Sequence, residues 1–353
     1  MDKFDAKIRI FFFLASIQQA VFISFFRSNH FINLLMLPLV LLVMWVFVLP
    51  KPEISNTENA FPLFLYAFQQ LRDQRIVMLS ISLLMIVMQA FFLTAVINRQ
   101  GVLREASHLP ALLYVVLMSC FPEQLSFNPL LFANFFIIMF LNSIFNFFRS
   151  DTAVFEVFDA GLFIGIGALF YWPCLFLFPI IWAGLYVLRP FAIREWAASL
   201  IGVFLPFLFF GTLLYWFNIL SLNSLIAILE PFYKVQFSTA YNGTYIILFV
   251  ILLTILLAAL FRFSRDLNTF AKVRTRKFLA IIVWFFLFAS LSYLVSVKRT
   301  MISLSFLAIP LSVIISNYFL SLKNQLLAEL IFLLLLAAVI YNQVLYFIQF
   351  SNF

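Results

Sequence analysis

Residues 76–97 read IVMLSISLLMIVMQAFFLTAVI, a run of twenty-two residues without a charged side chain. A helix needs about 20 mostly apolar residues to cross the roughly 30 Å of hydrocarbon in a bilayer. Lipid offers no hydrogen bonds to the backbone, so a run of this kind crosses as an α-helix, which satisfies its own peptide groups. The stretch therefore predicts a transmembrane helix.

The composition of the whole chain supports the same class. Of 353 residues, 65% are hydrophobic and 10% are charged, whereas soluble domains carry about 25% charged residues. This excludes a soluble enzyme and a secreted disulfide scaffold, and the hydrophobicity excludes a disordered chain. Cys120 and Cys174 lie in apolar runs without a CxxC motif, which argues against a metal or redox site. The expected fold class is all-α, a polytopic transmembrane helical bundle.

Ten further apolar runs accompany residues 76–97, so that we expect about eleven spans in a single membrane domain covering residues 1–353. The further runs are 31–49, 110–121, 130–148, 157–171, 173–188, 196–217, 245–261, 278–297, 301–320 and 326–347. The runs 110–121 and 157–171 are short for a straight crossing.

The basic residues predict the orientation, because Lys and Arg collect on the cytoplasmic side of membrane proteins. If residue 31 starts inside, sixteen of the 22 basic side chains lie on the inner side. The other six lie outside: Lys51, Arg72, Arg75, Lys234, Lys298 and Arg299. This distribution predicts a cytoplasmic N-terminus and a C-terminus outside. It also explains the net charge of +8, so no nucleic-acid partner is expected.

Four segments fall between or before the predicted spans. Residues 1–30 predict an amphipathic or re-entrant helix on the inner face; a crossing by residues 8–26 would place bases outside, against the charge rule. Residues 50–75 predict a first outer loop, and residues 218–244 predict another. Residues 262–277 predict a basic cytoplasmic loop whose attraction to anionic lipids suffices to explain its six bases. The first outer loop ends in an apolar stripe that predicts an interfacial helix: Phe61, Phe64, Leu65, Phe68 and Leu71.

Ionisable residues inside a membrane are costly and mark function by default. Glu156, Asp159 and Glu329 lie at the inner ends of predicted spans, where an interfacial position also explains them. A general base must lie where a substrate meets the membrane boundary, as Glu53 and Glu58 do. The alternative is that these are solvated loop acids. The acids predicted to face outward are Glu53, Glu58, Asp73, Glu123 and Glu230.

Three short elements carry a resemblance to a known family. They are SHLP at 107–110, FDAG at 158–161, and RPF at 189–191 followed by REW at 194–196. The chain resembles, over roughly residues 27–217, an uncharacterised family of bacterial multi-pass inner-membrane proteins of unknown function. The resemblance implies a bacterial inner (cytoplasmic) membrane location and no particular activity.

The order of the parts also resembles, more distantly, the GT-C class of multi-pass glycosyltransferases, which take a sugar from a polyprenyl-phosphate donor. This resemblance implies a catalytic carboxylate in the first outer loop, here Glu53 or Glu58. It also implies a second acid where the next outer loop enters a span. That place holds Asn128 and Asn134, with Glu123 just upstream, and the usual first-loop Asp is absent.

Two hypotheses about function follow, with Glu53, Glu58 and Glu123 as the candidate catalytic residues. The first is GT-C-like sugar transfer from a lipid-linked donor at the outer face. The alternative is a non-catalytic membrane subunit or scaffold of a cell-envelope complex. The expected partners are membrane lipids, with a polyprenyl-phosphate-linked sugar under the first hypothesis and other membrane-protein subunits under the second. No cofactor is expected; a divalent metal enters only with GT-C-like catalysis, and its ligands are not identified.

Overall fold

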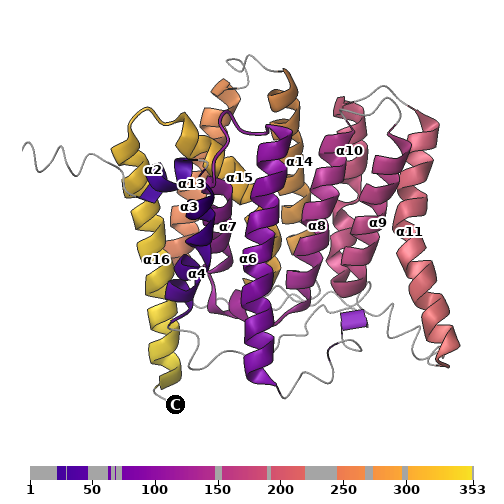
Figure 1. The fold of residues 1–353 in the computed structure, drawn as a ribbon, viewed down its shortest axis with the longest axis horizontal. Coiled ribbons are helices and arrows are strands. Elements are labelled where there is room, and N and C mark those ends of the chain that lie inside the picture. Colours follow the sequence, from indigo (N-terminus) through magenta and orange to yellow (C-terminus); the bar gives the residue numbers. More distant parts are fainter. Residues whose placement is uncertain are drawn as a thin grey trace, which may run out of the picture.

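The computed structural model describes residues 22–28, 30–46, 63–64, 68, 74–147, 153–188, 192–218, 245–266, 273–295 and 301–351. Within these ranges the regular elements are helices, which confirms the all-α class (Figure 1). The elements before residue 150 are α2 (Phe22–Arg27), α3 (Phe31–Leu35), α4 (Leu37–Trp45), α6 (Arg75–Gln100), α7 (Leu109–Met118), the 3-10 helix η2 (Pro122–Leu125) and α8 (Pro129–Asn146). Those after it are α9 (Val154–Phe170), η3 (Trp172–Leu177), α10 (Pro179–Leu188), α11 (Ile193–Trp216), α13 (Ile246–Asp266), α14 (Val273–Val295), η5 (Met301–Leu304), α15 (Ser305–Ser321) and α16 (Gln325–Ser351).

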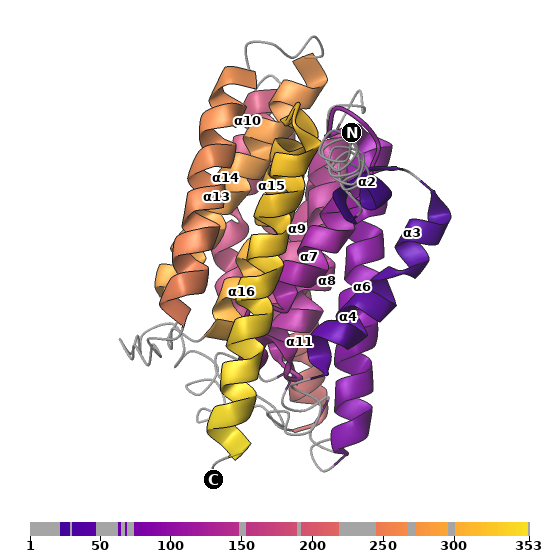
Figure 2. The same ribbon diagram turned by 90° about the vertical axis from the view of Figure 1, so that its left-hand side faces the viewer.

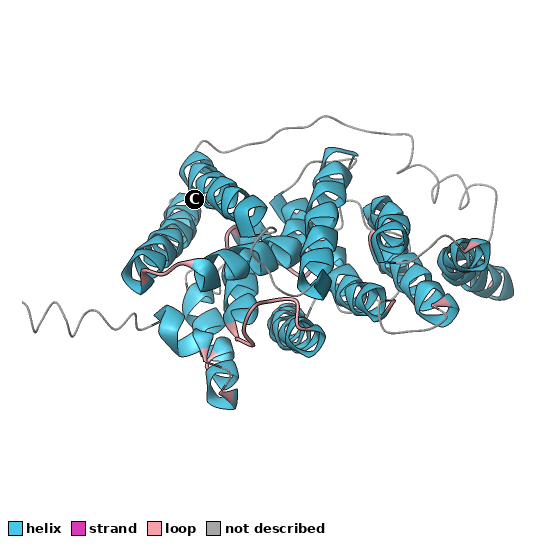
Figure 3. Ribbon diagram, turned by 90° about the horizontal axis from the view of Figure 1, so that it is seen from above, coloured by secondary structure: helices cyan, strands magenta, loops and turns pink. Residues whose placement is uncertain are grey.

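The helices run side by side as a bundle whose centre contains α7 and α15 (Figures 1 and 2). Every residue of α7 is buried, and so are most residues of α15. Helix α15 packs against α7, α13 and α14, whereas α9 packs against α8 and α11. Seen from above, α11 stands at one end of an elongated arrangement (Figure 3). The core is therefore built around two central helices, with α11, α13 and α16 at the periphery.

Among the residues that the structure describes, six helices are long and apolar enough to cross a membrane. They are Arg75–Gln100, Pro129–Asn146, Ile193–Trp216, Val273–Leu294, Met301–Ser321 and Gln325–Ile348. Four shorter apolar helices accompany them: Ile32–Trp45, Leu109–Met118, Trp172–Val187 and Ile246–Arg262. Each apolar run that the sequence singled out is mostly helical where the structure describes it, but the count of about eleven spans stays a prediction.

Three of the predicted runs are interrupted helices. The first is divided at Met36 into α3 and α4, and Pro38 stands at the start of α4. Another begins as η3 and continues as α10 from Pro179. A proline lacks the backbone N–H that a helix interior needs but fits the first helical turn, so both prolines start a new helix. The third run, 301–320, begins as η5 before α15.

Glycines allow α9 and α11 to approach closely. A Cβ built on Gly161 would meet the backbone oxygen of Ser199, and one on Gly165 would lie 2.6 Å from the backbone oxygen of Val203. Gly202, on α11, faces the backbone oxygen of Phe158 in the same way. Small residues at such positions let the backbones of membrane helices pack closely, and Gly161 and Gly165 do so here.

Two buried carboxylates join helices through backbone N–H groups. Glu329 of α16 accepts the N–H groups of Phe22 and Ile23, each at 2.9 Å, at the start of α2. Glu195 of α11 accepts the N–H of Ala153 at 3.1 Å, directly before α9. The first N–H groups of a helix have no partner within it, so a carboxylate there satisfies them and complements the helix dipole. Glu195 and Glu329 therefore stabilise the fold by joining helices.

Bases of the segment 262–277 make bonds inside the protein. Arg262 Nη2 donates to the backbone oxygen of Ser321 at 3.2 Å, and Arg274 Nη2 donates to Gln100 Oε1 at 3.0 Å. The Arg274 guanidinium also lies 5.1 Å from the ring centre of Phe278. Attraction to lipid is therefore not the only function of this segment, because two of its bases connect helices.

Several expectations fall outside the described residues. They concern residues 8–21, most of residues 50–75 and nearly all of residues 218–244. From the stripe predicted to lie along the outer interface, Phe64 and Phe68 are described, and both rings pack on Phe132, with ring centres 5.9 and 4.7 Å apart. That part of the stripe faces the protein.

Candidate functional site

Of the three candidate carboxyls, Glu123 lies within the described residues, whereas Glu53 and Glu58 lie outside them. Glu123 belongs to η2, which connects α7 to α8 at the lower end of the bundle in Figure 1. The lower ends of α6, α11 and α16 extend beyond this connection in the same view. Glu123 is therefore the acid around which a site can be built.

Local hydrogen bonds hold the turn that carries Glu123. Ser126 Oγ donates to the backbone oxygen of Glu123 at 2.7 Å, and Asn128 Nδ2 donates to the backbone oxygen of Ser126 at 2.9 Å. Asn128 Oδ1 accepts the N–H of Leu131 at 3.0 Å and so caps α8. Bonds of this kind stabilise a turn followed by a helix, so the Glu123 backbone is fixed by the residues that follow it.

The two oxygens of the Glu123 carboxyl differ in their hydrogen bonding. Oε1 accepts a hydrogen bond of 2.9 Å from the Tyr245 hydroxyl, at the start of α13. Oε2 is buried and has no hydrogen-bond partner among the described residues. Burial raises the pKa of the Glu123 carboxyl, and the bond from Tyr245 offsets part of that rise. A carboxyl in this state exchanges its proton closer to neutral pH than an exposed glutamate does, which suits acid–base chemistry.

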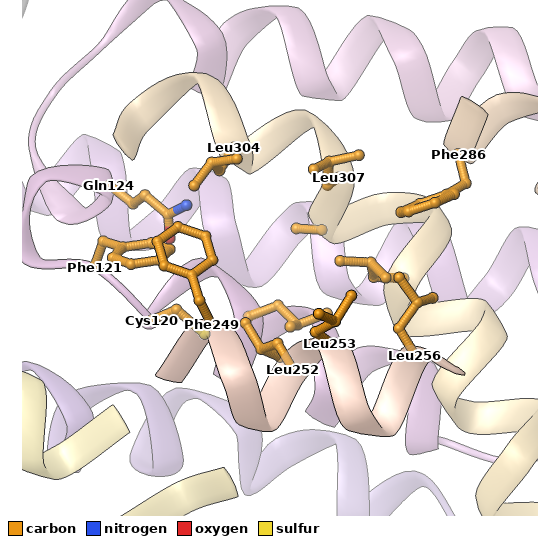
Figure 4. Close-up of a pocket in the computed structure, with 13 residues that line it drawn as sticks. Cys120, Phe121, Gln124, Phe249, Leu252, Leu253, Leu256, Phe286, Leu304 and Leu307 are labelled. Carbon is orange, nitrogen blue, oxygen red and sulfur yellow. The ribbon is translucent and has the colours of Figure 1, made fainter. Parts of the chain in front are cut away.

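A cavity of about 160 Å³ lies beside η2, between α7, α13, α14 and α15 (Figure 4). Its lining is Leu117, Cys120, Phe121, Gln124, Phe249, Leu252, Leu253, Leu256, Phe286, Leu304, Leu307, Ala308 and Leu311. Apart from Gln124 these side chains are apolar or, in Cys120, a thiol. Apolar cavities of this size stay dry and bind apolar molecules.

The wall of the cavity formed by α13 reaches the outside of the bundle. Helices α13 and α14 each pack on α15 and make few contacts with one another. Leu253 of α13 both lines the cavity and is 55% exposed. The side of the cavity between α13 and α14 is therefore the one nearest to the surface of the bundle.

Phe121 and Gln124 connect the carboxyl to the cavity. The Phe121 ring packs on Tyr245 and on Phe249, with ring centres 5.2 and 5.4 Å apart. Gln124, the neighbour of Glu123 in η2, donates from Nε2 to the backbone oxygen of Met301 at 3.2 Å. The acid–base group and the apolar cavity are thus parts of one region.

Buried amides hold the elements around this region. Gln343 of α16 donates to the backbone oxygen of Ser119 at 2.9 Å, at the end of α7. Asn134 of α8 donates to the backbone oxygen of Ser305 at 3.4 Å, at the start of α15. In the GT-C resemblance, Asn128 and Asn134 occupy the place of a second acid; the structure gives both of them bonds to backbone groups.

Sequence analysis did not find Gln124, Tyr245 or Gln343 as residues of a site. Tyr245 stands 122 positions from Glu123, so their spacing carries no signal. Gln343 is an amide within a predicted span, and polar groups there usually bond to a neighbouring helix. The position of Gln343 therefore predicts a bond to a neighbouring helix, but it does not predict which residue accepts that bond.

The described residues contain no group of three or more His, Cys, Asp or Glu side chains that could hold a metal ion. The divalent metal therefore stays an expectation tied to GT-C-like catalysis.

A family model described as "Family of unknown function (DUF6427)" matches residues 59–353. No curated protein and no solved structure gives a match. The match agrees with the expected family of unknown function, although it begins later and extends further than the range 27–217. It gives no support to the GT-C resemblance.

Proposed function

This chain belongs to the DUF6427 family, whose model matches most of its length, and we propose that it is a multi-pass membrane protein that transfers a sugar from a lipid-linked donor. In this proposal Glu123 is the proton-transfer group, and the cavity between α13 and α14 holds the hydrocarbon chain of a lipid substrate.

One observation carries the proposal: the buried Glu123 carboxyl, which has an oxygen without a partner among the described residues, belongs to the same short helix as Gln124, which lines an apolar cavity that also has the exposed Leu253 in its lining. An entrance lined by Leu and Phe on the side of the bundle does not bind a soluble substrate well, whereas the chain of a lipid enters it directly from the bilayer. The carboxyl then lies near the polar end of the lipid, where a group transfer takes place.

The proton transfer follows from the two oxygens of Glu123. In the ionised carboxyl, Oε2 takes the proton of an acceptor hydroxyl, while the Tyr245 hydroxyl bonded to Oε1 orients the group. The acceptor oxygen forms a bond to the anomeric carbon of the sugar. The bond from that carbon to the phosphate oxygen breaks, and its electron pair leaves with the lipid phosphate. Glu123 then releases the proton to water.

Turnover of a lipid-linked donor tests the proposal. The purified protein in detergent is incubated with a polyprenyl-phosphate-linked hexose and a long-chain alcohol as acceptor, and the released polyprenyl phosphate is measured by mass spectrometry. We expect Glu123→Gln to lower the rate by at least about 100-fold, since it removes general-base catalysis. Glu105→Gln is the matched control, because Glu105 is an exposed acid paired with Arg27 at 3.4 Å; its rate should equal that of the wild type.

No donor consumption by the wild type would contradict sugar transfer. Full activity of a folded Glu123→Gln variant would contradict the role of Glu123 as the proton-transfer group. Copurification with other membrane proteins in mild detergent, together with no turnover, would favour the alternative of a non-catalytic subunit of a cell-envelope complex.

For the orientation, we infer a bacterial inner membrane with η2 and the C-terminus outside. The end of α6, the end of α13 and the start of α14 lie at the opposite end of the bundle from the C-terminus in Figure 1, and these helix ends carry Arg99, Arg262 and Arg274. The charge rule puts such an end in the cytoplasm. A reporter fused after Phe353 should then be found outside, and a cytoplasmic reporter would contradict the orientation.

A further inference from the structure

Gln124 is the polar amide in the lining of an otherwise apolar cavity. Its side chain is 2% exposed, and its Oε1 is buried without a hydrogen-bond partner among the described residues. Figure 4 shows Gln124 at the same end of the cavity as Cys120 and Phe121. A buried acceptor without a donor is costly, so a ligand that supplies a donor there gains affinity.

The orientation of the Gln124 amide follows from its other contact. The backbone oxygen of Met301 can only accept a hydrogen bond, so the NH₂ group of Gln124 must face it, as the distance of 3.2 Å shows. Oε1 is then the atom left for a ligand. A water molecule does not fit beside Gln124 Oε1, because a buried water needs two to four polar partners. The described lining of the cavity offers this one amide.

The charge around Gln124 indicates which kind of hydrogen-bond donor the ligand carries. None of the described residues that line the cavity is charged, and the nearest titratable side chain along η2 is Glu123, an acid. A phosphate placed beside Gln124 would meet an acceptor and a carboxyl without a cation from the lining, which is unfavourable. A neutral hydroxyl group instead donates to Gln124 and adds no charge.

We propose that the ligand of this cavity is a lipid alcohol, whose chain lies between α13 and α14 and whose hydroxyl donates to Gln124 Oε1. This inference rests on the proposed function and makes it more specific. The molecule in the cavity is the hydroxyl-bearing acceptor, and the phosphate-linked donor binds elsewhere. The O–H of the acceptor bonds to Gln124 Oε1 in the resting complex and turns toward Glu123 Oε2 when the proton is transferred.

Competition between matched probes tests the proposal. A photoreactive diazirine analogue of dodecane labels the purified protein, and 1-decanol, decyl methyl ether and decyl phosphate compete with it. We expect 1-decanol to compete at a concentration about tenfold lower than the ether, because only the alcohol donates a hydrogen bond. Decyl phosphate should compete less well than 1-decanol.

The variant Gln124→Met keeps the length of the side chain but has no amide. In this variant, 1-decanol and decyl methyl ether should both compete, at concentrations within about twofold of each other. Its melting temperature shows whether the fold survives loss of the bond to Met301. If this variant does not fold, the comparison of alcohol and ether in the wild type still tests the proposal.

Equal competition by alcohol and ether in the wild type would overturn the inference, as would an unchanged preference in a folded Gln124→Met protein. Stronger competition by decyl phosphate would assign the cavity to a phosphate-bearing lipid instead. Failure of sugar transfer is a separate result, because these measurements need no turnover. Failure of all three probes to compete would contradict the lipid cavity itself.

Discussion

Glu123 and Glu329 are buried acids with different surroundings. Both oxygens of Glu329 accept backbone N–H groups of α2 at 2.9 Å, so its carboxylate is satisfied by structure alone. Glu123 has one bond, from Tyr245, and one buried oxygen without a partner among the described residues. An acid whose oxygens are all satisfied stabilises a fold, whereas an acid with a free oxygen is available to a ligand or a proton.

The raised pKa of Glu123 predicts how pH affects stability. The native protein holds this proton more tightly than the unfolded chain, whose carboxyl has the ordinary pKa of 4.5. The resulting stabilisation is complete below that value and is lost as the pH rises through the native pKa. Glu123→Gln cannot ionise. Its melting temperature relative to the wild type should therefore increase between about pH 4 and about pH 8.

Melting curves followed by intrinsic fluorescence in detergent measure this difference. Glu105→Gln, which removes an exposed acid, should show no such increase. A difference between Glu123→Gln and the wild type that stays constant with pH would show that Glu123 is not buried as described.

At the scale of elements, close contact between α9 and α11 depends on glycine. Helix α11 offers a matched pair of positions, since a Cβ on Gly202 meets the Phe158 backbone oxygen and one on Gly211 has no atom within 4 Å. Gly202→Ala must push the helices apart, which we expect to cost about 1–3 kcal/mol. Gly211→Ala should be neutral or stabilise by about 0.5–1 kcal/mol, because alanine favours a helix.

Thermal unfolding of the two alanine variants in the same detergent measures both effects. Equal melting temperatures for Gly202→Ala and Gly211→Ala would contradict the close packing of α9 on α11.

At the scale of the molecule, the apolar runs predict helices well because a long run without charge has few other structures open to it. Residues 76–97 lie within α6, and the short run 110–121 corresponds to the short helix α7. The breaks at Met36 and before α15 are less predictable, since they depend on how neighbouring helices pack. A count of apolar runs is therefore not a count of spans.

The site was predictable only in part. Glu123 is an acid between two apolar runs, which the sequence displays directly. Its partner Tyr245 and the cavity come from segments far apart in the chain, from Leu117 to Leu311. Which faces of α7, α13, α14 and α15 meet is decided by packing, and a single sequence does not specify it.

In the proposed function, the cavity between α13 and α14 takes a lipid chain. Two neighbouring exposed leucines of α13 test it: Leu253 lines the cavity and is 55% exposed, and Leu257 is 58% exposed and does not line it. Labelling with the diazirine analogue of dodecane, mapped by mass spectrometry, should modify residues 304–311 in the wild type and in Leu257→Trp. Leu253→Trp fills the entrance and should abolish that labelling. Equal labelling of residues 304–311 in both tryptophan variants would contradict the account.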